Sequence, residues 1–241
     1  MNRLLPALVL LAAILFAASP LMVTSFAGFD PALFPVPQDR PPVQPAGYTF
    51  IIWGLLYGWL IVSAGYGLLK RPEDPAWLPA RPWLLASLVM GIFWLPLAER
   101  SVIGATVLIW AMAATAFMAL WNTRRRDRWW FQAPVATFTG WLVAASSVSI
   151  GLILAGWGVM GETPAALLAL TLALVIGLAI QAEVPRAPGV GLAMIWALIG
   201  VLVHNLSPVN LPVAGLAGIG ILAFIALLAR GRGEPKKRKS A

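Results

Sequence analysis

Long apolar segments constrain this chain more than any other feature of its sequence. They run for about 17 to 23 residues, and each is long enough to cross a hydrocarbon layer of about 30 Å as a helix. Hydrophobic residues make up 60 % of the chain and charged residues 11 %, a charged share about half that of water-soluble proteins. Backbone groups in lipid must be satisfied within a segment, and the strand alternation of an outer-membrane barrel is absent. The sequence therefore predicts an all-α, polytopic transmembrane helical bundle.

About eight transmembrane helices are expected, because proline, glycine or charged residues interrupt the apolar sequence at seven places. The chain has no cysteine, which excludes disulfides, thiolate metal sites and cysteine nucleophiles. The expected helices cover residues 4–24, 47–69, 83–97, 101–121, 131–156, a sixth segment that follows residue 164 and reaches 181, 189–203, and 209–229.

The basic residues predict the orientation of the bundle. Eight helices place both termini on one side, and all but two of the 17 lysines and arginines fall on that side. The exceptions are Arg40 and Arg100. By the positive-inside rule we expect a multi-pass protein of the cytoplasmic (inner) membrane, with both termini cytoplasmic and the proline-rich loop 25–46 outside. The basic clusters 124–130 and 236–239 indicate topology, with anionic lipid headgroups as the alternative reading; nucleic acid is not an expected partner.

The first apolar run has two readings. Its basic start and the stretch Ser25-Phe-Ala27 resemble a signal peptide with a small-residue cleavage site. The run is long for a signal peptide, which favours a retained first transmembrane helix. In the loop that follows, six prolines favour an extended, stiff path. If the first helix is cleaved, the remaining helices keep their orientation.

The expected helix interiors contain no Asp, Glu, Lys or Arg. Ion-coupled transporters and proton pumps usually carry ionisable residues there. The single histidine, His204, ends the seventh helix, where a histidine is more often interfacial than a metal or haem ligand. No nucleophile–base pair is visible, so we expect a protein that is not an enzyme, has no metal site and requires no cofactor.

Twelve tryptophans are many for 241 residues. Six of them lie near expected helix ends, a position typical of the membrane-interface belt: Trp77, Trp83, Trp121, Trp129, Trp130 and Trp157. Others lie deeper, at Trp94, Trp110, Trp141 and Trp196, and together with Trp53 they indicate an aromatic cavity, with bundle packing as the alternative reading.

The aromatic residues that open the second helix are the strongest local pattern. Trp53 and Tyr57 are four residues apart and share one helix face, after Tyr48 and Phe50. Gly54 and Gly58 are also four apart on an adjoining face, where a neighbouring backbone can approach closely. This stretch is read either as a wall of a ligand cavity or as an interfacial anchor.

Three motifs resemble the TspO/MBR family, the tryptophan-rich sensory proteins related to the peripheral benzodiazepine receptor. After the proline-rich loop, Trp53, Leu56 and Tyr57 match the family's Trp-x-x-Leu-Tyr. Trp94-Leu-Pro96 is similar to the Trp-x-Pro of its third helix. Trp141 and Ala145 match the fifth-helix pattern Trp-x3-Ala-x3-Asn, with Ser149 at the asparagine position.

The resemblance implies an arrangement of domains. It covers residues 1–157 as a TspO-like five-helix region, followed by three additional helices in 158–229 and a basic cytoplasmic tail in 230–241. The string Ile195 to Gly200 is similar to one in longer tryptophan-rich sensory proteins. Gly91 and Ser149 stand where the family commonly has asparagine, so the aromatic positions carry over better than the polar contacts.

The resemblance also implies a function, that of an integral membrane receptor, sensor or transport-like binder of a flat amphipathic ligand. The ligand classes are tetrapyrroles (porphyrin or haem) and sterol-like lipids, held in a bundle cavity that the first loop caps. The residues expected to bind it are Tyr48, Phe50, Trp53, Tyr57, Trp94, Trp141, Ala145 and Ser149.

Two alternatives stay open. In one, the chain is a non-catalytic structural or assembly subunit, packed against a larger membrane protein complex or forming a homodimer, with its tryptophans and small residues facing outward. In the other, it is a small-molecule permease, which the uncharged helix interiors disfavour. Membrane lipids are expected partners in every case.

Overall fold

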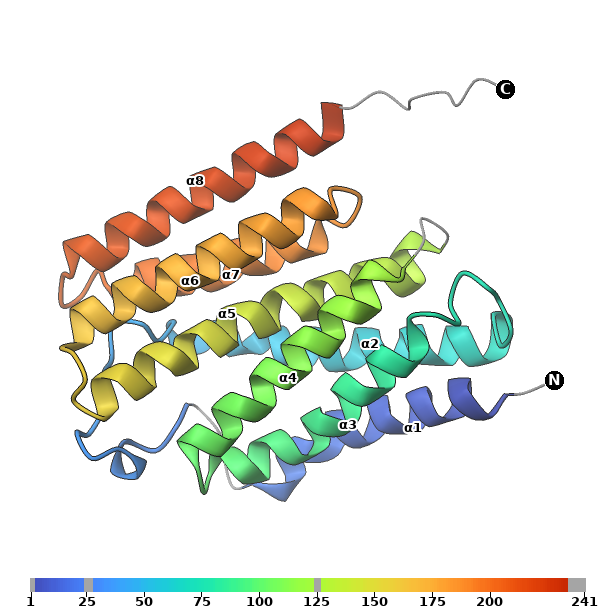
Figure 1. Ribbon diagram of the computed structural model, residues 1–241, viewed down its shortest axis with the longest axis horizontal. Helices are drawn as coiled ribbons and strands as arrows, with labels where there is room; N and C mark the ends of the chain where they lie inside the picture. The colour runs from blue at the N-terminus through green and yellow to red at the C-terminus, as the bar shows by residue number, and fades with distance from the viewer. Residues whose placement is uncertain (1–2, 24–27, 124–126, 234–241) are drawn as a thin grey trace.

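A computed structural model of the chain describes residues 3–23, 28–123 and 127–233. Regular structure in these ranges is helical, which confirms the predicted fold class (Figure 1). The stretch 25–27, the arginines at 124–126 and the tail cluster 236–239 lie outside the described residues. The α-helices are α1 (Leu4–Ala18), α2 (Ile52–Lys70), α3 (Arg81–Ala98), α4 (Val102–Trp121), α5 (Ala133–Gly156), α6 (Glu162–Glu183), α7 (Gly189–His204) and α8 (Leu211–Gly233).

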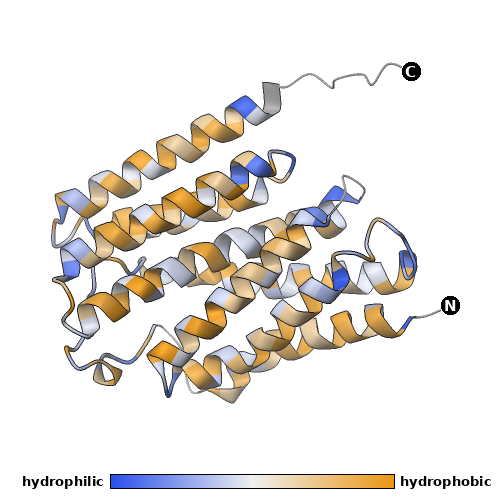
Figure 2. Cartoon of the chain, in the orientation of Figure 1, coloured by the Kyte–Doolittle hydropathy of each residue, from blue (hydrophilic) through white to orange (hydrophobic). Residues whose placement is uncertain are grey.

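Seven of the helical segments are long and apolar enough to cross a membrane, and α7 is a shorter apolar helix. Figure 2 shows hydrophobic residues along the helices and polar residues gathered towards their ends. The chain is therefore a multi-pass membrane protein. The helix boundaries differ from the predicted ones chiefly at α1, which ends at Ala18 and continues as a short 3-10 turn, Ser19–Met22, that contains Pro20.

The first five helices form a closed ring in the order α1, α2, α5, α4, α3. The remaining helices extend this ring on one side, because α6 and α7 pack on α5, and α8 packs on α6 and α7 (Figure 1). Helix α5 is thus enclosed on all sides. Its small residues allow this close packing: a Cβ at Gly140 would lie 2.5 Å from the Val190 carbonyl oxygen.

Helix α5 also carries several buried hydroxyl groups. Those of Thr137, Thr139, Ser147 and Ser149 each donate to the carbonyl four residues earlier, at 2.8–3.0 Å. Such a bond satisfies the hydroxyl within its own helix, as membrane burial requires. The polar residues of α5 are therefore compatible with its position at the centre of the bundle.

The two described ends of the chain lie at the same end of the bundle, where α1 begins and α8 finishes (Figure 1). The connections α2–α3, α4–α5 and α6–α7 reach this end as well. We call it the basic end, because it carries the connections after α2, α4 and α6. These are the connections whose lysines and arginines predicted a cytoplasmic location. The other end, which carries residues 28–46, is called the loop end.

At the basic end, the α2–α3 connection folds onto the bundle. Arg71 forms an ion pair with Asp127 (Nε to Oδ2, 2.8 Å), and the hydrogen bond that it donates raises the pKa of the Arg71 guanidinium above its ordinary value. Trp77 donates to the same carboxylate at 3.1 Å and stacks on Phe131, with ring centroids 3.9 Å apart. Because Trp77 is only 2 % exposed, its expected place in the membrane-interface belt was wrong.

Candidate functional site

The loop at the other end of the bundle is fastened to the helices by backbone groups. The amide of Val36 donates to the carbonyl of Gly156 at 2.8 Å, and that of Ala46 donates to Gly200 at 3.0 Å. The side chain of Asn205 donates to the carbonyl of Pro42 at 2.8 Å. The loop thus donates two of these bonds through its own amides, and α7 donates the third through the Asn205 side chain. The segment 36–46 is held across the bundle by α5 and α7.

An apolar cavity of about 70 Å³ lies beneath this loop. Residues of the loop, the turn Gly47–Ile51, and helices α3, α4, α5 and α7 line it. Five of the eight expected binding residues are among them, namely Phe50, Trp94, Trp141, Ala145 and Ser149. The other lining residues are Gly28, Phe29, Gln44, Pro45, Ile109, Ala144, Val148, Leu152, Ala197 and Val201.

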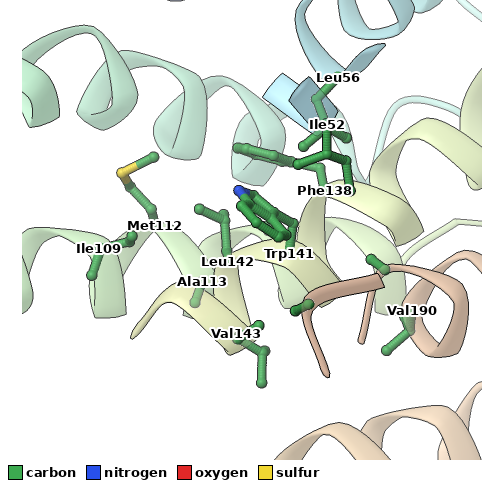
Figure 3. Packing of buried hydrophobic residues seen from close by; sticks show 14 of the residues in the cluster. Ile52, Leu56, Ile109, Met112, Ala113, Phe138, Trp141, Leu142, Val143 and Val190 are labelled. Atoms are coloured by element: carbon green, nitrogen blue, oxygen red, sulfur yellow. The ribbon is translucent and has the colours of Figure 1, made fainter. Parts of the chain in front are cut away.

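The two tryptophans of the cavity differ in their hydrogen bonding. The indole N–H of Trp94 donates to the carbonyl of Ala105 at 3.0 Å, which holds this ring against α4. The buried indole N–H of Trp141 has no acceptor among the described residues. Figure 3 shows the Trp141 ring between Phe138, Leu142 and the apolar side chains of α2. A ligand with a hydrogen-bond acceptor would satisfy this donor.

Trp53 and Tyr57 lie beside the cavity instead of on its wall. They stack on each other at 5.5 Å, and Trp53 meets Trp141 edge-on at 6.0 Å. Phe16 of α1 covers them, with its ring 5.9 Å from that of Trp53 and 5.0 Å from that of Tyr57. Trp53, on which Tyr57 stacks, therefore packs against Trp141 on the side of the Trp141 ring that faces away from the cavity.

Gly91 explains how Phe16 reaches this position. A Cβ on Gly91 would lie 2.6 Å from the Phe16 ring, so the ring rests directly on the backbone of α3. The asparagine that the related motif commonly carries here would need the same space. The replacement of the family's common asparagine by Gly91 therefore leaves the space that Phe16 of α1 occupies.

The three other expected residues differ in their roles. Tyr48 is 47 % exposed and packs edge-on against Trp196 at 5.8 Å, outside the cavity lining. Ala145 and Ser149 lie on the cavity side of α5. The Ser149 hydroxyl donates to the Ala145 carbonyl at 3.0 Å, so it offers a ligand its lone pairs more readily than its proton.

Sequence reasoning missed two groups of residues at this site. Phe29 lies in the loop, 6.4 Å from Trp94 between ring centroids, and no motif distinguished it from the other loop residues. Ala197 and Val201 come from α7, within and just after the Ile195–Gly200 string that was linked to the longer relatives. That string was the available signal that α7 contributes to the cavity.

The arrangement can bury apolar surface and stack aromatic rings, because the lining contains no ionisable side chain. Among the described residues, no group of three or more His, Asp or Glu residues is placed to hold a metal ion. Drug-sized ligands occupy pockets of about 300–1,000 Å³. The cavity of about 70 Å³ therefore admits a large ligand only when some of its lining side chains move.

Comparison with known protein families gives one match. A family model described as "TSPO-like protein" matches residues 37–229, from the loop at the end of the bundle to helix α8. The matched range includes α6, α7 and α8 as well as α2 to α5. No curated protein and no solved structure matches the chain.

Proposed function

Because this membrane protein belongs to the TSPO-like family, we propose that it is a receptor or transport-like binder whose ligand enters the cavity beneath the 28–46 loop. The ligand would be flat and largely apolar and would carry a hydrogen-bond acceptor. A tetrapyrrole is the class that the resemblance to tryptophan-rich sensory proteins implies, with a sterol-like lipid as the second class. Binding, not catalysis, is the proposed activity, since the lining side chains supply no acid or base.

The observation that carries this proposal is the unpaired indole N–H of Trp141 in an aromatic wall. A buried donor without an acceptor costs about 1–3 kcal/mol. A ligand acceptor at this position would recover that free energy, while Phe50 and Trp94 would contact the apolar body of the ligand. An aromatic contact adds about 0.5–1.5 kcal/mol beyond burial.

The size of the cavity assigns a role to Phe29. Phe29 packs its ring on Trp94 and Phe34 at the edge of the cavity. Withdrawal of this ring from Trp94 would enlarge the cavity. A tetrapyrrole would enter at the position that this ring leaves.

Filling the cavity tests the proposal. We expect Ala145→Leu to weaken binding of protoporphyrin by about tenfold or more, because extra methyl groups in a packed site cost about 1–3 kcal/mol. Binding is measured by quenching of tryptophan fluorescence in lipid nanodiscs. Ala114→Leu is the matched control, since Ala114 lies on an exposed face of α4 within its apolar span.

Equal affinity of the parent and Ala145→Leu would place the ligand elsewhere and contradict the proposed site. The alternative function, an assembly subunit, expects outward-facing tryptophans and small residues. The burial of Trp94 and Trp141 disfavours it. The exposed small residues Gly54 and Gly58 favour it, as do the exposed tryptophans, which are Trp83, Trp121, Trp129, Trp130 and Trp157. Native mass spectrometry that detects a stable heteromeric complex, together with no binding of protoporphyrin, would support the assembly function.

A further inference from the structure

A second and larger hollow lies on the side of the bundle. Its volume is about 630 Å³, and it runs between α2 and α7 over a floor made by α5 and the preceding turn Arg128–Gln132. In Figure 1, α2 lies behind α5 and α7 lies behind α6. We call it the α2–α7 groove. Its lining residues are Ile51, Ile52, Gly54, Leu55, Trp59, Arg128, Trp129, Gln132, Ala133, Thr137, Ala187, Pro188, Gly189, Leu192, Ala193 and Trp196.

Hydrogen bonds between tryptophans and backbone carbonyls join the elements around this groove. Trp196 of α7 donates to the carbonyl of Thr49 at 2.9 Å, which ties α7 to the turn that precedes α2. Nearer the basic end, Trp59 of α2 donates to the carbonyl of Trp129 at 3.0 Å. Each bond joins segments that are distant in the sequence, so the groove is a built feature of the tertiary structure.

The sides of the groove are apolar and face outward within membrane-spanning helices. Leu55 of α2 is 57 % exposed and Leu192 of α7 is 56 % exposed. Gly54 lies between α2 side chains that line the groove, and a Cβ at this glycine would meet nothing within 4 Å. In a bilayer, an outward-facing apolar surface contacts the hydrocarbon of the lipids. Because Gly54 has no side chain, a lipid chain can approach the backbone of α2 at this position.

The basic end of the groove carries positive charge. Arg128 lines it and is exposed, and its guanidinium makes no ion pair or hydrogen bond within the described part of the chain. The nearby Arg186 is engaged differently, because it donates to the carbonyls of Trp121 and Thr123. The Trp129 side chain is 70 % exposed beside Arg128, as is typical of a residue at the headgroup level.

We propose that the α2–α7 groove binds one anionic phospholipid from the membrane leaflet at the basic end. Its acyl chain lies against Leu55, Gly54 and Leu192, and its phosphate pairs with Arg128. Basic pockets between transmembrane helices recognise anionic headgroups in this way. This site is separate from the cavity beneath the loop, and it shares no lining residue with that cavity.

The shape of the groove favours a lipid over a helix of a second copy. From Ile51 to Trp59 its length is about 12 Å at 1.5 Å per residue. A volume of about 630 Å³ over this length corresponds to a mean cross-section of roughly 50 Å². An α-helix with side chains, 10–12 Å in diameter, occupies roughly 80–110 Å². An acyl chain, which is thinner than a helix, fits this cross-section more closely.

The test compares two lipids on the purified full-length chain. Native mass spectrometry measures the affinity for phosphatidylglycerol and for phosphatidylcholine with identical acyl chains. We expect the parent to prefer phosphatidylglycerol, and Gly54→Leu to weaken its binding by about tenfold, since the new side chain fills the groove. Gly58→Leu is the matched control: it is the same change one turn along α2, at an exposed position outside the groove lining.

Arg128→Gln tests the headgroup contact. We expect it to reduce the preference for phosphatidylglycerol by about fivefold, the effect of one basic residue near an anionic surface, and to leave phosphatidylcholine binding unchanged. Lys70→Gln, an exposed residue of the basic end outside the groove lining, should keep the preference. Equal binding of the two lipids by the parent, or unchanged binding by Gly54→Leu, would overturn the proposal. So would a dimer that both glycine substitutions abolish, because that result would identify a second copy as the occupant.

Discussion

Two tryptophans line the cavity under the loop, and their indole N–H groups differ in one respect. Trp94 donates to Ala105, whereas Trp141 has no acceptor among the described residues. Replacing either ring with phenylalanine removes the same atoms from the same cavity. The two substitutions therefore separate the effect of the hydrogen bond from the effect of the lost ring volume.

We expect Trp94→Phe to lower the free energy of unfolding more than Trp141→Phe does, by about 1 kcal/mol, because it breaks an existing hydrogen bond. We expect the reverse order for protoporphyrin affinity, with Trp141→Phe weaker than Trp94→Phe by about fivefold, since Trp141 would lose its bond to the ligand. Thermal unfolding in detergent and fluorescence quenching measure the two quantities. Equal losses of affinity in the two variants would show that the Trp141 N–H does not bind the ligand.

Short motifs predicted several residues of the candidate site. Phe50, Trp94 and Trp141 line the cavity, and each lies in or beside a motif of the family that the chain resembles. Trp53 and Tyr57 belong to the same motifs but are covered by Phe16. The position of Phe16 depends on how α1 is rotated in the bundle. A sequence motif contains no information on that rotation.

At the level of helices, α1 and α3 are in tight contact where Phe16 meets Gly91. The ring of Phe16 also packs against Phe138 of α5 at 5.8 Å, so it cannot move away easily. Together with its contacts to Trp53 and Tyr57 of α2, Phe16 joins four helices through one side chain. It requires that α3 have no side chain at position 91.

A methyl group at position 91 should therefore separate the helices. We expect Gly91→Ala to lower the free energy of unfolding by about 1–3 kcal/mol, the usual cost of an inserted methyl group in a packed core. Gly58→Ala is the control, since a Cβ at Gly58 meets nothing within 4 Å and alanine favours a helix. Thermal unfolding of the two variants and the parent gives the comparison. A Gly91→Ala variant as stable as Gly58→Ala would show that the Phe16 contact is easily displaced.

Helices α5 and α8 show the limit of prediction at this level. Both are apolar enough to cross a membrane, yet 72 % of the residues are buried in an apolar 18-residue window of the α5 span and 28 % in that of the α8 span. Amphipathic periodicity, which separates buried from exposed faces in soluble proteins, is weak when the solvent is also apolar. Which helix is central was therefore decided by packing, and small residues such as Gly140 permit it.

For the whole molecule, the arrangement of the connections agrees with the proposed orientation, in which the basic end is cytoplasmic. The prediction is directly testable because the chain has no cysteine of its own. Single cysteines can be placed at Asp39, exposed at the loop end, and at Glu73, exposed in the α2–α3 connection of the basic end. The positive charge at the basic end is the physical reason for the expected orientation.

We expect a membrane-impermeant maleimide to label Asp39→Cys in intact cells and to label Glu73→Cys only after permeabilisation. The unmodified chain is the control for background labelling, since it contains no thiol. Labelling of Glu73→Cys in intact cells with protection of Asp39→Cys would show that the molecule is inserted the other way round.

The sequence by itself determined the class of fold, the number of helices and their approximate limits, because apolar length and the prolines, glycines and charges that interrupt it are local properties. It also placed Trp94 and Trp141 among the candidate site residues. The tertiary structure decided that Phe16 covers Trp53 and Tyr57, that α7 helps to hold the loop over a cavity of about 70 Å³, and that a groove opens between α2 and α7. These features depend on the rotation and spacing of helices that are far apart in the chain, which only their mutual packing sets.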